Sequence, residues 1–283
     1  MQASGFELAR SSAAKALLLV APAAALACSS ETPERPPLVR CDSASQTGCL
    51  ADQGISGRSG GGSRDAGATD SGDTAVEREL SGTLVFIDSE VFEPQGVPFR
   101  ERARVFAEAA EGGFIEDTVT GGELALQDVI AEPELWAGVI PETPVDALPT
   151  WSRVVNDPTE PATLGLVRES MLDGIYSVLP LPVLRASGFA QLVIRFIDAG
   201  TGASLSGVQL VAPQAETVIY DAGLTFSNDA TATGVDGIAL AANLEAVSWP
   251  GSLQSFALAG AASGSVQALL ARDAVTVVTI GLE

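Results

Sequence analysis

Three cysteines carry the most reactive side chains of this chain, because thiolates form lipid, disulfide and metal bonds. Cys28 directly follows an apolar run that begins at Ala16. Cys41 and Cys49 lie further on, in a segment of small and polar residues. These positions favour covalent attachment or cross-linking.

The sequence lacks the residues that most common hydrolases use. It contains no histidine, and its one lysine is Lys15. Ser/His/Asp and Cys/His catalysis, histidine zinc sites and lysine Schiff bases are therefore excluded. The net charge of −21 argues against a nucleic-acid partner, since binding a polyanion requires a dense basic surface. We expect no catalytic residue, no cofactor and no metal.

Residues 1–27 have the features of a signal peptide. Arg10 and Lys15 precede the apolar run of residues 16–25. That run is too short to cross a bilayer of about 30 Å as a permanent helix, which is typical of a signal peptide removed after export. We therefore predict an exported protein whose mature chain begins at Cys28.

The residues before Cys28 decide what happens to its thiol. Ala25-Leu26-Ala27-Cys28 resembles the lipobox of bacterial lipoproteins, in which the cysteine receives a diacylglyceryl group. The commonest form of that motif begins with Leu where this chain has Ala25. The same residues also form an ordinary small-residue cleavage site, which would leave a free thiol.

The number of cysteines favours lipidation of Cys28. If Cys28 carries a lipid, Cys41 and Cys49 remain as a pair that can form a disulfide in an oxidising compartment. On the chain-entropy model that small loop would be stabilised by about 2–3 kcal/mol. A zinc site is the poorer alternative, because two thiolates without histidine or further cysteine do not complete one.

Three tryptophans are the candidate ligand contacts: Trp136, Trp151 and Trp249. Aromatic faces pack well on sugar rings, which would suit a carbohydrate ligand. Burial in a core or at a domain contact is the commoner role of tryptophan. The sequence alone leaves both roles open and favours the second.

Acidic residues offer two weaker candidates. Asn228, Asp229 and Asp236 carry oxygen ligands for Ca²⁺, but the sequence has no spaced Asp-x-Asp-x-Asp loop. Glu116 and Asp117 are a carboxylate pair of the kind that glycoside hydrolysis requires. A chain with 36 acidic residues contains such pairs by chance, so neither is a strong signal.

The segment that would carry the lipid, residues 28–81, is rich in Gly and Ser. It includes Gly60-Gly61-Gly62-Ser63 and few apolar side chains, too few to offset the entropy cost of ordering. We expect a lipidated cysteine, a small disulfide loop and a disordered tether with a root-mean-square reach of about 40 Å. Such a tether would hold the folded part near the membrane.

From residue 82 onward the sequence has the pattern of an all-β fold. Short apolar and β-branched runs alternate with Gly, Pro, Asn and Asp. Segments of the first half, beginning at residues 82–88, match segments of the second half, beginning at residues 191–198, in the same order. This internal repeat indicates two copies of one β unit. The expected strands are residues 84–87, 102–107, 191–197, 207–211, 237–240, 254–258 and 274–280.

We therefore predict two small Greek-key β-sandwich units after the signal peptide and tether. The first covers residues 82–141 and the second residues 189–283. Residues 142–188 form a connector whose structure the sequence leaves open. Either residues 162–172 form a short helix, or residues 173–179 form a turn and a strand.

The second unit resembles the carboxypeptidase regulatory-like and collagen-adhesin B-type family of transthyretin-like β-sandwiches. The resemblance rests on a strand ending in Asp198, a Thr-Gly turn, a Gly-Val restart and the hairpin turn Asp236-Gly237. It covers residues 189–283 and, more weakly, residues 82–141. It implies a non-catalytic stalk or binding module. The adhesin relatives form a Lys-to-Asn or Lys-to-Asp isopeptide bond, which this chain cannot form because no lysine follows residue 15.

Together these features predict a lipoprotein anchored to a bacterial outer membrane, with β-sandwich modules for binding or structural roles. Its expected partners are the membrane, through the lipid, and a protein or polysaccharide of the cell envelope. The alternative is a carbohydrate-binding or carbohydrate-active protein that uses the tryptophans and paired carboxylates.

Overall fold

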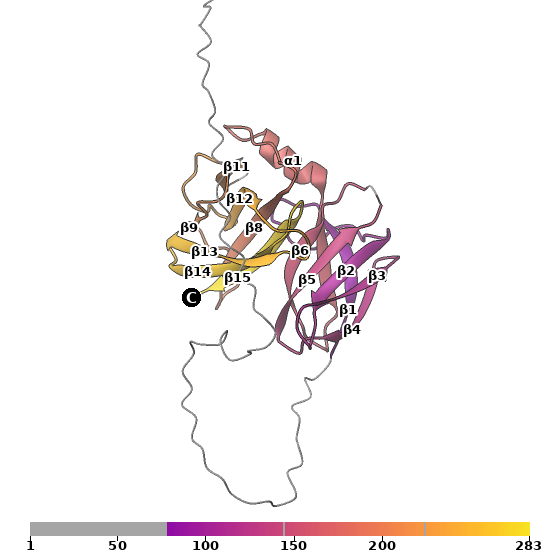
Figure 1. Ribbon diagram of the computed structural model, residues 1–283. Coiled ribbons are helices and arrows are strands. Elements are labelled where there is room, and N and C mark those ends of the chain that lie inside the picture. The colour runs from indigo at the N-terminus through magenta and orange to yellow at the C-terminus, as the bar shows by residue number, and fades with distance from the viewer. Residues whose placement is uncertain (1–77, 144, 224) are drawn as a thin grey trace, which may run out of the picture. The chain divides into compact units, whose positions relative to one another are not determined.

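The computed structural model of this protein describes residues 78–143, 145–223 and 225–283 (Figure 1). The predicted signal peptide, the three cysteines and almost all of the predicted tether lie outside the described residues. The first seven strands are β1 (Arg78–Ile87), β2 (Ala103–Glu108), β3 (Phe114–Val119), β4 (Glu123–Val129), β5 (Glu134–Pro141), β6 (Thr150–Val155) and β7 (Ala162–Val167). The helix α1 (Glu169–Ser177) follows, and then β8 (Phe189–Asp198), β9 (Val208–Val211), β10 (Thr217–Asp221), β11 (Phe226–Ser227), β12 (Ile238–Glu245), β13 (Ser252–Gly260), β14 (Gly264–Leu270) and β15 (Val275–Leu282).

The prediction of an all-β fold is confirmed, and each of the seven predicted strands overlaps an observed strand. Alternation explains the first part of a half-exposed strand such as β4, where Leu124 and Leu126 are buried and Glu123, Ala125 and Gln127 are exposed. Strand β15 differs, because residues 275–278 are all buried. Both of its faces are covered, as its continuous Val-rich sequence requires.

The strands form two sandwiches that share one sheet (Figure 1). In the first, the sheet β4-β1-β7 packs on β3-β2-β5-β6. In the second, the sheet β14-β13-β9 packs on β11-β10-β12-β8-β15. Strand β6 pairs in parallel with β15 through residues 150–152 and 275–277, so the two larger sheets continue into one nine-stranded sheet.

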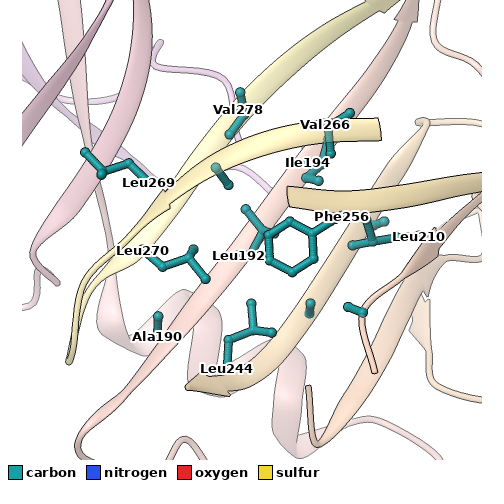
Figure 2. Packing of buried hydrophobic residues seen from close by; sticks show 14 of the residues in the cluster. Ala190, Leu192, Ile194, Leu210, Leu244, Phe256, Val266, Leu269, Leu270 and Val278 are labelled. Carbon is teal, nitrogen blue, oxygen red and sulfur yellow. The ribbon is translucent and has the colours of Figure 1, made fainter. Parts of the chain in front are cut away.

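The core of the second sandwich lies between its two sheets (Figure 2). Phe256 of β13 is almost fully buried and packs with Leu192 and Ile194 of β8 and Leu210 of β9. The opposite face of the larger sheet is covered by α1, whose Leu172 and Ile175 belong to a second buried cluster with β8, β12 and β15. Burial on both faces therefore fixes β8 in the middle of this half.

Of the two alternatives for the connector, the short helix is correct only from residue 169 onward, and the turn and strand at residues 173–179 is wrong. Residues 162–167 form β7, which pairs in parallel with β1, and residues 169–177 form the helix. Gly165 suits the strand, because a Cβ atom at this position would lie 2.5 Å from the side chain of Ile87. The helix has no capping side chain in its own sequence, since Arg168 at the N-cap makes no cap bond. Asp146, far back in the chain, accepts hydrogen bonds from Ser170 instead.

Asp146 gives the start of α1 a measurable pH dependence. Its hydrogen bonds with Ser170 hold the pKa of this carboxyl below its ordinary value of 3.8. Because the pKa is lowered by folding, the stabilisation is fully present above the ordinary, unfolded-state pKa. It is lost as the pH falls through the folded-state pKa. Asp146→Ala should therefore lower the free energy of unfolding by about 1 kcal/mol at neutral pH, measured by urea denaturation.

The difference between Asp146→Ala and the unmutated chain should shrink in acid. Asp146→Asn is the matched variant, since it keeps one acceptor oxygen for the Ser170 N–H but carries no charge. It should lose less stability, and its stability relative to Asp146→Ala should not depend on pH. An equal loss for both variants at all pH values would contradict the role of the charge.

Candidate functional site

The three tryptophans lie where the two sandwiches meet. Trp151 of β6 is fully buried and stacks on Trp249 with ring centroids 4.7 Å apart and an interplanar angle of 16°. Trp136 of β5 is 6% exposed and belongs to the same buried cluster. Gly138 makes room for this packing, because a Cβ there would lie 2.6 Å from the Trp151 ring.

This arrangement is a domain contact. Trp151 presents no exposed face on which a sugar ring could stack, and Trp249 turns one face to Trp151. The contact is not fully satisfied, since the indole Nε1 atoms of both residues are buried without a hydrogen-bond partner among the described residues. The tryptophans thus fix the sandwiches together.

The acidic candidates do not converge on a common site. Glu116 and Asp117 are neighbours on β3 and therefore point to opposite sides of the sheet. Glu116 forms an ion pair with Arg104 at 3.1 Å, and Asp117 accepts a hydrogen bond from the Thr118 N–H. No group of three or more His, Cys, Asp or Glu residues in the described part of the chain is placed to hold a metal ion.

A buried aspartate that sequence reasoning missed organises the turn around Asp236. Asp221, at the end of β10, is 2% exposed. Its carboxylate accepts hydrogen bonds from the backbone N–H groups of Gly234, Asp236 and Ile238 at 2.9, 2.8 and 2.7 Å. The role of Asp221 is structural, because it anchors the loop that leads into β12.

The most exposed apolar residues near a described pocket lie in the α1–β8 loop, residues 178–188. Val178 is 70% exposed, Leu181 67% and Leu184 85%. Large side chains of this kind usually lie in the interior, and a group of them in one loop is typical of an interaction site. The segment is rich in proline, with Pro180 and Pro182 beside Leu181.

Two asparagine side chains from the second sandwich hold the backbone of this loop. Asn228 donates from Nδ2 to the Leu181 carbonyl at 2.7 Å and accepts from the Leu181 N–H at 3.3 Å. Asn243 donates from Nδ2 to the Leu184 carbonyl and accepts from the Ala186 N–H, both at 2.9 Å. Each amide therefore pairs with the loop backbone as a neighbouring strand would.

A buried polar network fixes Asn243 in turn. Asn243 has a left-handed φ of 53°, at an irregularity of the β12–β8 pairing. Its Oδ1 accepts from Gln191 Nε2 at 3.0 Å, and the Tyr176 hydroxyl donates to Gln191 Oε1 at 2.6 Å. Burial raises the pKa of Tyr176, so the hydroxyl keeps its proton and remains a donor. The network connects the loop to α1.

Arg185 closes the other side of the loop onto the helix. Its guanidinium forms ion pairs with Glu169 and with Asp173, the latter at 3.2 Å. A pocket of about 560 Å³ lies here, lined in part by Tyr176, Pro182 and Leu184. The loop thus has contacts with α1, β12 and the β11 region, yet its Val178, Leu181 and Leu184 side chains are exposed.

This site suits non-covalent binding. It contains no cysteine, histidine or lysine, and its arginine is committed to two carboxylates. The sequence did carry one signal for it, the apolar and proline-rich stretch at residues 178–184. The asparagines that hold the loop are distant in sequence and gave no such signal.

No protein-family model and no curated protein matches this sequence. Three solved structures show a distant similarity. A streptococcal ancillary pilin is 13% identical over 75% of this chain with a TM-score of 0.21, and the group B streptococcus pilus 2b backbone protein is 12% identical over 72% with a TM-score of 0.21. The shaft pilin SpaA from Lactobacillus rhamnosus GG is 8% identical over 73% of this chain with a TM-score of 0.20. The matches cover 63%, 91% and 98% of those chains, so this chain spans less than two thirds of the first. TM-scores near 0.2 carry no argument about function, and the fold rests on the strands described above.

Within the described residues, no helix has the length and apolar character needed to span a membrane.

Proposed function

We propose that this protein is a non-catalytic binding module of a bacterial envelope, exported and anchored to the outer membrane through a lipid on Cys28. The binding role rests on the α1–β8 loop, which exposes Leu181 and Leu184. Asn228 and Asn243, from outside the loop, hold its backbone in place by hydrogen bonds. Preorganisation of this kind lowers the entropy cost of binding.

The shared nine-stranded sheet supports this proposal. Through β6 and β15 and the stacked Trp151 and Trp249, the first sandwich supports the second, which carries the loop. A rigid support is what a binding loop requires, since sites on a fixed scaffold lose less freedom on binding.

We also propose the family resemblance for the second sandwich. Asp198 ends β8 and accepts hydrogen bonds from the N–H groups of Gly200 and Thr201, as an Asp before a tight turn can do. Gly237 has a φ of 69°, which suits the Asp-Gly turn before β12. These turns fit the pattern on which the resemblance to the carboxypeptidase regulatory-like family rests.

The carbohydrate alternative has less support. Trp151 is inaccessible, and Glu116 and Asp117 point away from one another. A glycosidase needs two carboxyl groups on the two sides of one bound sugar.

The anchor is tested by replacing the proposed lipid attachment site. Cys28→Ala should move the protein from the membrane fraction to the soluble fraction and abolish incorporation of labelled fatty acid, because one thiol carries the lipid. Both are measured after ultracentrifugation of cells that produce the full chain.

Cys41→Ala and Cys49→Ala are the matched controls, because each removes a thiol from the same segment. Both variants should remain in the membrane fraction. If Cys28→Ala stays with the membrane, or if a control is released equally, the anchor proposal is wrong.

A further inference from the structure

We infer that the α1–β8 loop docks a cationic, amphipathic segment of another protein, one that places aliphatic or aromatic side chains beside Lys or Arg. This inference rests on the proposed binding function and adds the chemistry of the partner. It follows from two properties of the loop, its apolar side chains and the charge around them.

The apolar half of the site is formed by the exposed side chains of Val178, Leu181 and Leu184, of which Leu184 lines a pocket. A poorly fixed loop is not the reason for the exposure of these side chains. The loop backbone is bonded to Asn228 and Asn243, and Val183 within the same loop is 6% exposed. A loop that buries Val183 and presents its neighbours to solvent is suited to an apolar partner.

The charged half is an excess of carboxylates around these residues. Glu169 and Asp173 lie on α1, Asp229 follows Asn228, and Asp273 accepts hydrogen bonds from Ser187 and Gly188 of the loop. Arg185 of the loop pairs with Glu169 and Asp173, and Arg272 adjoins Asp273, so these four acids leave an excess of two negative charges. A partner with positive charges around an apolar centre would complement this surface.

The same charges disfavour other occupants. A second copy of this chain would bring the same acids, and a bilayer of anionic lipids would also be repelled. A polyanionic ligand is excluded for the same reason. A cationic protein segment satisfies both the apolar and the charged half of the site.

The test uses the full exported chain, purified in detergent, and fluorescently labelled synthetic helical peptides. A Lys/Leu peptide should bind, whereas a Lys/Ser peptide of equal charge and a Glu/Leu peptide should bind at least about tenfold more weakly. Leu181→Ser/Leu184→Ser should raise the dissociation constant of the Lys/Leu peptide by about tenfold, measured by fluorescence anisotropy. Both leucines are exposed, so this variant should fold; Leu184→Ser alone provides a second, milder test.

Val155→Ser/Leu253→Ser is the matched control, because both residues are exposed but lie on β6 and β13. It should bind the Lys/Leu peptide as the unmutated chain does. Equal binding of the Lys/Leu and Lys/Ser peptides, or no effect of the loop variant, would overturn the inference. So would loop-dependent binding to anionic phospholipid vesicles, or loop-dependent self-association by analytical ultracentrifugation, in place of peptide binding.

This result is separate from the anchor test. A chain that is released by Cys28→Ala but binds none of the peptides refutes the partner and leaves the anchor intact. A chain that binds the peptide through the loop but is not lipidated refutes the anchor and leaves the partner intact.

Discussion

Asp221→Ala should lower the free energy of unfolding by about 3–5 kcal/mol, because it leaves one buried and two part-buried N–H groups without their acceptor. Each unpaired buried donor costs about 1–3 kcal/mol, and partial access of water reduces the total. Urea denaturation followed by far-UV circular dichroism measures the loss. Since the carboxylate holds the entry to β12, the effect should be a lower denaturation midpoint for the whole second sandwich.

Asp198→Ala is the matched control for Asp221→Ala. Asp198 also accepts backbone N–H bonds, from Gly200 and Thr201, but these groups are exposed to water. Water replaces the lost acceptor there, so the cost should stay near or below about 1 kcal/mol. Similar losses for the two variants would show that burial of Asp221 is not what makes it important.

Trp151→Ala should lower the free energy of unfolding by a similar amount, about 3–5 kcal/mol. The ring is fully buried between the sandwiches and contacts Phe106, Phe114 and Trp249, with centroids 6.3, 5.0 and 4.7 Å away. Removing it leaves a large cavity that β strands on both sides cannot fill by side-chain rotation alone. Urea denaturation should show the loss.

Val155→Ala is the control for Trp151→Ala, since Val155 lies on the same strand but is 66% exposed. Its effect should stay within about 0.5 kcal/mol. The unmutated chain should unfold in one transition, because β6 and β15 join the sandwiches into one sheet. Two separate transitions that Trp151→Ala leaves unshifted would contradict a coupling through this contact.

Local pattern was enough to predict seven of the strands. In β15 the Val-rich run at residues 275–278 indicates a strand buried on both faces. Such signals lie within a few residues of one another. They say which segments are strands, but not which strands become neighbours.

Several of the errors and omissions involve partners distant in the chain. The start of α1 depends on Asp146, and the strand at residues 162–167 depends on parallel pairing with β1. From the sequence, Trp151 and Trp249 could belong either to a core or to a sugar site. Their stacking depends on the pairing of β6 with β15, which joins segments distant in the chain. The candidate site is least predictable, because Asn228 and Asn243 act on a loop tens of residues earlier.

The position of β15 between β8 and β6 has a consequence for the order of folding. This strand follows every other described strand in the sequence, yet it is the neighbour of β8 throughout its length and of β6 for three residues. Until residues 275–282 are in place, β6 and β8 each lack a hydrogen-bonding partner on one edge. The pairing of β15 with these two strands joins residues far apart in the sequence. Contacts so distant in sequence form slowly, so both halves reach their final state together and late.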